Sequence, residues 1–399
     1  MAILDLEPLG AIQYNRDYIG DQLDWKGGTI MAQNNTRKTS IWRQLGYIVL
    51  CLIVGAVIGL LIGRFFGPSL ADQMRHVSIT YLLATFIVST VLHIIIHEGG
   101  HLLGGLLTGY KFVSFRVMDL KLEKSESGGF KFRWQHVAGI GGQCLMRPPR
   151  YQSQKFPFRL YLAGGFLANI LTSVLAYWLW PNIYVFVFAS LGILMGLTNA
   201  IPMSFNDGKN LLLLSKSELN RLVLFIMLED NYWANRGKSY DEKYRYLRRV
   251  TINETNFLTD ATIFYDLEQL VDQGQFEEVY ILAKKIYQER EDMVTPYRQE
   301  ILRLLLFAAS LQHPEDPLIT TLLEDPLLVA MLKTKRPENS TAQAAYHWRV
   351  KGDVVTALEH LAQAKKRLPR AHNLRAQEQE ARIIDYLEEK IQAEQTSNN

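Results

Sequence analysis

The amino-acid sequence predicts an all-α polytopic membrane protein with a soluble helical domain at its C-terminal side. The 399 residues leave room for two domains, and the apolar residues are concentrated in the first half of the chain. From about Asp207 onward the sequence is charged, and its apolar residues recur at helical spacing. The net charge of +3 is too small to indicate a nucleic-acid-binding protein. The two cysteines, Cys51 and Cys144, are too few for a disulfide framework or for a zinc site built from cysteine.

About four apolar segments reach the length of roughly 20 residues that a membrane-spanning helix needs. They are residues 46–64, 79–103, 160–180 and 183–203. We interpret residues 1–45 as a polar N-terminal segment and residues 46–64 as a retained anchor, because no small-residue cleavage site follows it. The last two segments are joined by "WPNIY", in which Pro181 ends a helix and the aromatic residues are typical of a membrane interface.

The distribution of lysine and arginine predicts the orientation in the membrane. The loop after the first segment carries only Arg64 and Arg75, whereas the loop between Leu107 and Arg159 is rich in basic residues. Basic loops stay on the cytoplasmic side. We therefore expect this loop, both termini and the helical domain to lie in the cytoplasm, at a bacterial cell membrane.

The basic loop contains a predicted β-hairpin. Residues 111–137 alternate apolar and polar side chains on both sides of a turn at Ser127-Gly128-Gly129. It could offer an edge to a bound peptide, and an ordinary surface hairpin is an equal alternative. The following stretch "AGIGGQCLMRPPR" is typical of a turn or a re-entrant segment, because it is rich in glycine and proline.

Residues 214–399 are predicted to form a cytoplasmic helical domain. Two segments, beginning at Gly274 and Gly352, each place a glycine turn before an amphipathic helix. This arrangement is typical of tetratricopeptide-type helix pairs, with an irregular helical bundle as the alternative. The domain could bind a protein partner or recruit a substrate. Unchanged cleavage after deletion of the residues beyond about 215 would contradict that hypothesis.

The segment 79–103 contains "HEGGH", a metal-binding pattern within apolar sequence. His97 and His101 are four residues apart, so a helix places both imidazoles on one face, where they can bind one metal ion. Glu98 can then act on a water at that ion. A charged group near the middle of a spanning helix costs about 2.5 kcal/mol or more, and a bound cation would offset such a cost. His93, one turn earlier, is more simply a hydrogen-bonded packing residue than a secondary ligand or a gate.

A catalytic zinc needs a third protein ligand, and Asp207 is the best candidate. It follows the segment 183–203, which Pro202 ends, and it precedes Gly208. The segments 79–103 and 183–203 run in the same direction across the membrane. Asp207 is therefore expected at the same depth as the two histidines, which a plain Asp-Gly turn does not explain.

These motifs together resemble the site-2 proteases, the family of intramembrane zinc metalloproteases. The resemblance rests on "HEGGH" and on "NAIPMSFNDG", which contains Asn199, Pro202, Asp207 and Gly208 in the family's spacing. The stretch "GFLAN", Gly165 to Asn169, is similar to the family's G-P-x-x-N signature, with Phe166 in place of proline. The likeness covers roughly residues 79–215. The basic loop is too short for a PDZ domain, so the chain resembles the branch without one.

The resemblance implies a core of three spanning helices, within residues 79–213, that holds one zinc ion through His97, His101 and Asp207. Glu98 would take a proton from a water and pass it to the leaving amine. Asn169 and Asn199 would hydrogen-bond the substrate strand or the oxyanion, although helix–helix hydrogen bonding explains Asn199 nearly as well. The implied substrates are membrane-spanning peptides within the lipid bilayer, such as anti-sigma factors or remnants of signal and leader peptides.

Two other functions are compatible with a chain that contains several apolar segments of membrane-spanning length. One is a membrane-anchored helical scaffold without protease activity, for which Glu98→Gln would change nothing. The other is a metal-handling transporter, which would show metal flux in vesicles and no peptide cleavage. Neither explains the third-ligand motif. The apolar context of "HEGGH" excludes a soluble zinc protease.

Overall fold

A computed structural model describes residues 77–124, 129–134, 141–203 and 205–397, and it is mostly helical. Three helices are long and apolar enough to cross a membrane: α3 (Ile79–Leu107), α4 (Arg159–Leu179) and α5 (Ile183–Ala200). They confirm the predicted segments 79–103, 160–180 and 183–203. The predicted anchor at residues 46–64 lies outside the described residues.

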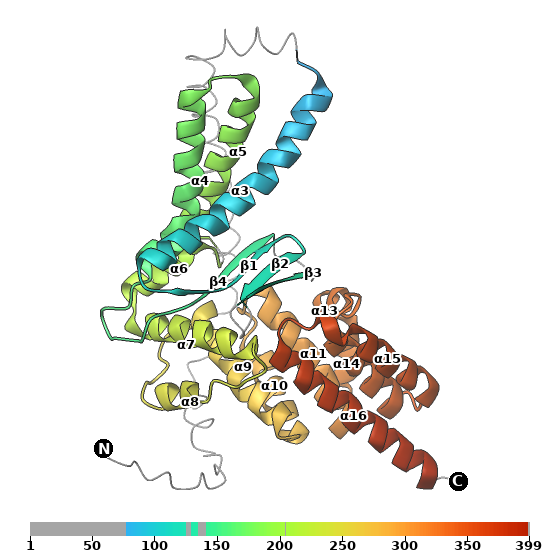
Figure 1. Ribbon diagram of the computed structural model, residues 1–399. Helices are drawn as coiled ribbons and strands as arrows, with labels where there is room; N and C mark the ends of the chain where they lie inside the picture. Colours follow the sequence, from blue (N-terminus) through green and yellow to red (C-terminus); the bar gives the residue numbers. More distant parts are fainter. Residues whose placement is uncertain (1–76, 125–128, 135–140, 204, 398–399) are drawn as a thin grey trace, which may run out of the picture. The chain divides into compact units, whose positions relative to one another are not determined.

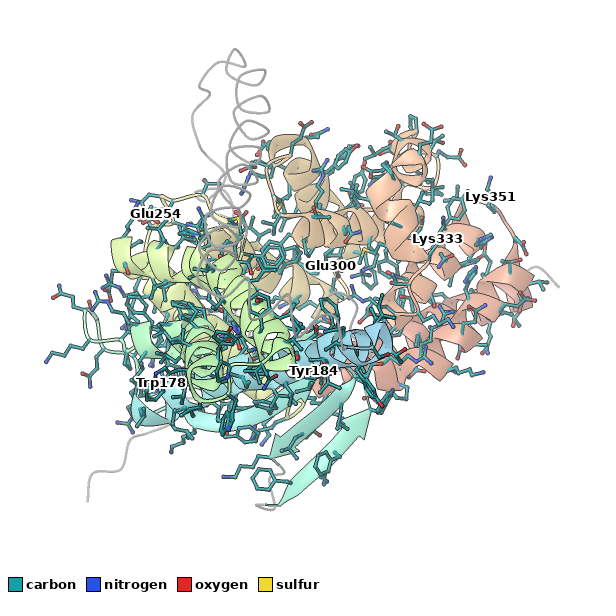
Figure 2. The ribbon with its side chains drawn as sticks, turned by 90° about the horizontal axis from the view of Figure 1, so that it is seen from above. Trp178, Tyr184, Glu254, Glu300, Lys333 and Lys351 are labelled. Carbon is teal, nitrogen blue, oxygen red and sulfur yellow. The ribbon has the colours of Figure 1, made fainter. Side chains whose placement is uncertain are left out.

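The connection between α4 and α5 is as short as "WPNIY" predicts. Asn182 caps α5, since its side-chain oxygen accepts hydrogen bonds from the backbone N–H groups of Tyr184 and Val185. Trp178 and Trp180 are 76% and 63% exposed. Trp178 and Tyr184 lie on the two sides of this connection (Figure 2). Exposed aromatic side chains at the end of an apolar hairpin are typical of a membrane–water interface.

Glycines allow α3 to pack directly against the backbone of α4, and Figure 1 shows α3 crossing the α4–α5 pair. A Cβ atom on Gly100 would lie 2.1 Å from the carbonyl oxygen of Gly164, and one on Gly104 would lie 2.2 Å from that of Leu160. No side chain fits between the two helices at these points. Small residues at helix contacts are typical of membrane proteins, where close packing drives association.

The basic loop folds into a four-stranded antiparallel sheet. Its strands are β1 (Lys111–Val117), β2 (Leu120–Lys124), β3 (Phe130–Trp134) and β4 (Gly142–Arg147), in the order β3-β2-β1-β4. The predicted hairpin is confirmed by β2 and β3, which pair from Leu120↔Trp134 to Lys124↔Phe130. The prediction of a turn or re-entrant segment was wrong for residues 142–147, which pair with β1 as strand β4.

The reason for this error is visible in β4 itself. Both prolines and all of the glycines except Gly142 lie outside the strand, and within it Cys144 and Met146 are buried in alternation. Met146 packs against α3 beside Gly105, where a Cβ atom would lie 2.3 Å from the methionine sulfur. The strand is therefore held by a contact with a helix distant in sequence, which the local pattern does not reveal.

The residues after α5 are mostly helical, and the predicted domain boundary at residue 214 stays a prediction. The elements of this part of the chain are α6 (Asp207–Lys216), α7 (Glu218–Ala234), α8 (Glu242–Leu247), α9 (Phe257–Asp272), α10 (Phe276–Glu289), α11 (Thr295–Gln312), α12 (Leu318–Glu324), α13 (Pro326–Leu332), α14 (Pro337–Arg349), α15 (Val354–Arg367), the 3-10 turn Leu368–Arg370 and α16 (Leu374–Ser397). Gly274 and Gly352 have φ angles of +68° and +65° and separate α9 from α10 and α14 from α15. The tetratricopeptide-type repeat stays a prediction.

Helix α7 connects the helical domain to the sheet. Arg147, at the end of β4, donates two hydrogen bonds to the carboxylate of Glu229 on α7, at 2.8 and 3.1 Å. Its guanidinium also lies over the ring of Tyr232, 4.2 Å from the ring centre. Lys121 of β2 donates to the side-chain oxygen of Asn235 at 2.9 Å. These bonds fix the sheet to α7 by charge-assisted contacts.

The crossing of α3 and α4 predicts that alanine destabilises the protein at Gly100 but not at the neighbouring Gly99. We expect Gly100→Ala to destabilise the protein by at least 1–3 kcal/mol, because the added carbon meets a carbonyl oxygen rather than a movable side chain. Gly99→Ala is the matched control, since nothing lies within 4 Å of its Cβ position. Thermal unfolding of the full-length proteins in detergent measures both. Equal unfolding temperatures for the two variants would contradict the packing described above.

Candidate metal centre

Three predicted ligands, His97, His101 and Asp207, meet at one point beside the crossing of α3 and α4. The Nε2 atoms of the two histidines are 3.1 Å apart. Oδ2 of Asp207 lies 3.1 Å from Nε2 of His97 and 3.3 Å from Nε2 of His101. All three side chains are largely buried, with exposed fractions of 12%, 9% and 18%. The structure thus brings together residues that are more than a hundred positions apart in the sequence.

This triangle has the dimensions of one face of a tetrahedral metal site. A tetrahedral ion with bonds of about 2.0 Å separates neighbouring ligand atoms by about 3.3 Å. Oδ2 of Asp207 is buried and accepts no hydrogen bond within the described part of the chain. Buried polar atoms normally have a partner, and a cation at the centre of the triangle would supply one. The three residues therefore fit a metal ion.

Each ligand is oriented by a neighbour that the motif alone does not reveal. Nδ1 of His101 lies 2.7 Å from the backbone oxygen of Tyr161 on α4. Since a carbonyl oxygen only accepts, Nδ1 carries the hydrogen and the lone pair of Nε2 is free for a metal. Nδ1 of His97 lies 3.4 Å from the side-chain amide of Asn169, also on α4. Outer partners of this kind are usual for metal-binding histidines.

Asp207 is positioned by its neighbour Asn206. The side-chain nitrogen of Asn206 donates to the backbone oxygens of Thr198 and Ile201 at the end of α5, both at 2.7 Å. Its oxygen accepts from the backbone N–H of Lys209 and so caps α6. One amide therefore joins the two helix ends and fixes Asp207 in the first turn of α6. The N-cap pattern of asparagine before "DG" was the signal in the sequence.

The carboxylate of Asp207 is held in its charged form. The position in the first turn of helix α6 favours a negative charge on this side chain. An ionised carboxylate with two imidazoles is a donor set that suits zinc, and it also suits iron(II).

Gly165 keeps the space in front of the histidines open. A Cβ atom on this residue would lie 2.4 Å from Nε2 of His101 and 2.7 Å from Nε2 of His97. Any larger side chain here would occupy the place of the ligand atoms. Gly165 was noted in the sequence as part of "GFLAN", but its contact with both ligand atoms depends on the helix crossing and could not be predicted.

Glu98 lies between the ligand group and the sheet. Its side chain is 8% exposed, and strand β4 approaches it closely, because a Cβ atom on Gly142 would lie 2.6 Å from Oε1 of Glu98. A carboxylate next to a metal group and beside a strand edge can exchange a proton with a water or a peptide there.

The two predicted asparagines differ in their surroundings. Asn169 is fully buried, and its amide lies between His97 and His93. Asn199 donates a hydrogen bond of 2.9 Å to the backbone oxygen of Met195 in its own helix. In the described conformation Asn169 contacts a ligand histidine, whereas the amide of Asn199 is engaged within α5. Their roles toward a substrate stay predictions.

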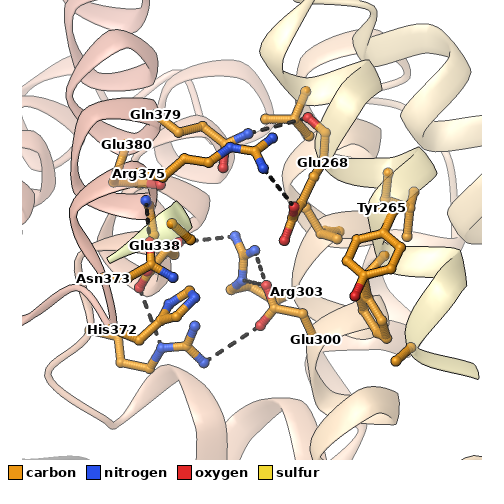
Figure 3. Close-up of a pocket in the computed structure, with 18 of the residues that line it drawn as sticks. Tyr265, Glu268, Glu300, Arg303, Glu338, His372, Asn373, Arg375, Gln379 and Glu380 are labelled. Carbon is orange, nitrogen blue, oxygen red and sulfur yellow. Dashed lines mark hydrogen bonds and ion pairs between the residues drawn. The ribbon is translucent and has the colours of Figure 1, made fainter. Parts of the chain in front are cut away.

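A cavity of about 350 Å³ lies in the helical domain between α7, α9, α11, α14 and α16 (Figure 3). Its charged groups are largely paired with one another: Arg303 with Glu300, Arg336 with Glu300 and Glu338, and Arg375 with Asp272. We interpret this network as structural.

Glu380 differs from the other acidic groups around the cavity. It is 4% exposed, it hydrogen-bonds Thr341, and it forms no ion pair with a described residue. Burial, and after it the charge of Glu338, raises the pKa of Glu380 to about 7. The folded protein therefore binds a proton at Glu380 over a pH range in which the unfolded chain does not.

Comparisons with models of known families, with curated proteins and with solved structures gave no match to this chain.

The triangle of ligand atoms predicts that the protein binds one divalent metal ion. We expect Asp207→Asn to weaken zinc binding at least about 100-fold, since loss of an outer partner alone costs 10- to 100-fold. Gly165→Ala should weaken it too, although it removes no ligand. The measurement is a zinc competition titration on the full-length protein in detergent.

Asp353→Asn is the control for this titration, because asparagine caps a helix as well as aspartate does. Binding by Asp207→Asn as tight as by the control would exclude the site.

The raised pKa of Glu380 predicts a pH-dependent stability. A carboxyl whose pKa is about 7 in the folded state and about 4.3 in the unfolded state stabilises the fold below pH 4, and this contribution is lost as the pH rises to 7. Glu380→Gln should therefore unfold a few degrees above the wild type at pH 8, with a smaller difference at pH 5. Thermal unfolding of the full-length protein at both pH values tests this. Glu359→Gln, an exposed glutamate on α15, should show no such pH dependence.

Proposed function

We propose that this protein is an intramembrane zinc metalloprotease of the site-2 protease type, which cleaves membrane-spanning peptides. The observation that carries the proposal is the triangle of His97, His101 and Asp207, with sides of 3.1–3.3 Å, next to the carboxylate of Glu98. The helices α3, α4 and α5 around these residues are long and apolar enough to cross a membrane, and each carries exposed leucine side chains. A water-activating centre within such helices suits hydrolysis of a peptide at the membrane.

The metal would supply a polarised water and would draw electron density from the carbonyl group of the scissile peptide. The remaining steps belong to the chain. The carboxylate of Glu98 takes a proton from the attacking water and later gives it to the nitrogen of the leaving amine. Nδ1 of His101 stays bonded to the backbone of Tyr161, which keeps that imidazole in place during the reaction. Gly165 leaves the space in front of Nε2 of both histidines free.

Strand β4 offers a place for the substrate. It is the last strand in the sheet order β3-β2-β1-β4, so its outer edge has no partner strand among the described residues. At Gly142 this strand lies beside the carboxylate of Glu98, since a Cβ atom there would lie 2.6 Å from Oε1. A substrate helix must unwind before its peptide bond can react, and an unwound segment can pair with a free strand edge. A segment paired there would present its backbone close to Glu98.

The proposal also includes the orientation of the chain in the membrane and the partners of the helical domain. We place both termini and the helical domain on the cytoplasmic side of a bacterial membrane, on the basis of the basic loop between Leu107 and Arg159. The hydrogen bonds between Arg147 and Glu229 connect β4 to this domain. We also propose that this domain has a tetratricopeptide-like fold, and that it binds a protein partner or recruits the substrate.

The decisive experiment compares the wild type with Glu98→Gln. Both proteins are reconstituted in vesicles with a panel of single-span membrane peptides, the products are identified by mass spectrometry, and the bound metal is analysed. We expect cleavage by the wild type and a loss of about 100- to 10,000-fold in rate for Glu98→Gln, since the variant lacks the proton acceptor. Its zinc content should be unchanged, because Glu98 is not a ligand.

Two results would overturn the proposal. One is an absence of bound metal in the wild type, and the other is equal cleavage by both proteins. Metal transport into the vesicles, without cleavage, would instead favour a transporter.

A further inference from the structure

His93 is a fully buried histidine that is not one of the three ligands. It lies on α3 one turn before His97 and has no exposed surface. Its Nε2 atom is 2.8 Å from the backbone oxygen of Phe188 on α5, and its ring stacks on the ring of Phe188 with the centres 4.1 Å apart. Its Nδ1 atom is 3.2 Å from the side-chain amide of Asn169 on α4. One side chain thus connects the three apolar helices through two directional contacts.

The hydrogens of His93 can be assigned from these contacts. The carbonyl oxygen of Phe188 only accepts, so Nε2 of His93 must carry a hydrogen. A neutral imidazole carries a single hydrogen, and therefore Nδ1 is an acceptor. Asn169 must then present its NH₂ group to His93, which places its oxygen toward His97. The structure has the opposite amide orientation, and a rotation of 180° exchanges the two atoms while keeping the contacts of 3.2 and 3.4 Å.

This assignment has a consequence for the ligand His97. With the oxygen of Asn169 facing it, Nδ1 of His97 must be the N–H donor. The lone pair of His97 is then on Nε2, the atom that lies 3.1 Å from both other ligand atoms. In the opposite orientation the amide would donate to Nδ1, and Nε2 would carry the hydrogen and could not bind a metal. The tautomer of His97 thus depends on which way Asn169 is turned.

We infer that His93 is a positioning residue: through Asn169 it fixes His97 in the tautomer that presents Nε2 to the metal. This inference rests on the metal site of the proposed function and adds a role that the ligand motif does not contain. His101 obtains the same tautomer directly from the backbone of Tyr161. His97 has a side-chain amide beside it instead, and an amide can turn either way. The acceptor on His93 selects one orientation.

The surrounding residues are arranged to hold His93. A Cβ atom on Gly192 of α5 would lie 2.1 Å from Cε1 of His93, so only glycine leaves room for the ring. An apolar side chain at position 93 would serve packing on Phe188 equally well and would avoid burying two polar atoms. A packing role alone therefore does not explain the two directional contacts of His93 with Phe188 and Asn169.

The test measures zinc affinity, by competition titration, for the full-length protein in detergent. We expect His93→Leu to weaken zinc binding about 10- to 100-fold, because the amide of Asn169 is no longer oriented. The absorption spectrum of the cobalt(II)-loaded protein should change as well, since it reports the ligand geometry. Ser173→Ala, which removes a hydrogen bond next to the ring without touching the relay, should bind zinc like the wild type.

A rescue separates positioning from simple destabilisation. In the Asn169→Asp background, either side-chain oxygen can accept from Nδ1 of His97, so the orientation set by His93 no longer matters. His93→Leu should then cost less than about 3-fold in zinc affinity, and this coupling is a double-mutant cycle. An equal loss in both backgrounds, or no loss in the native one, would overturn the inference.

A second pair of variants keeps the test valid if His93→Leu does not fold. His93→Asn keeps an acceptor near the position of Nδ1, and His93→Gln keeps a donor near the position of Nε2. We expect His93→Asn to retain zinc affinity and His93→Gln to lose it, and the reverse order would contradict the relay. If the wild type binds zinc and cleaves peptides, and the His93 variants bind zinc equally well, only this inference is contradicted. Wild-type protein without metal would sink the proposed function.

Discussion

The contact between Gly100 of α3 and Gly164 of α4 is the constraint on which the rest of the structure depends. It brings two helix backbones so close that no side chain can lie between them. Because the helices cross there, the next residue of α4, Gly165, lies against both ligand histidines, and the backbone of Tyr161 reaches His101. A wider crossing would separate the histidines from the groups that orient them. The positions of His97 and His101 relative to α4 therefore depend on the short distance between α3 and α4.

Each ligand is held in a different way, and the differences follow from where it lies. His101 is bonded to a backbone oxygen that a neighbouring helix exposes, whereas His97 depends on a side-chain amide. Asp207 comes after the end of an apolar helix, where Asn206 ties two helix ends together. Inside an apolar helix pair nearly all backbone groups are used by the helices themselves, so polar side chains such as Asn169 must supply the missing partners.

The sequence predicted the parts of the structure that follow from local spacing and from topology. The i, i+4 histidines, the three described apolar helices and the proximity of Asp207 to the histidines needed only periodicity and chain direction. Strand β4 was missed because its stability comes from β1 and from α3, which no local pattern shows. The contacts of Gly165 and the relay from His93 depend on helix crossings, which a single sequence does not determine. Asn206 could have been found, since asparagine before a helix start is a recognised cap.

Strand β4 has one further consequence. At Gly142 it lies against Glu98, and five residues later, at Arg147, it is bonded to α7. Five strand residues span roughly 17 Å. In mechanical terms β4 is a short rigid rod with one end beside Glu98 and the other end on α7. The two regions that the chain separates by composition therefore share one inextensible element.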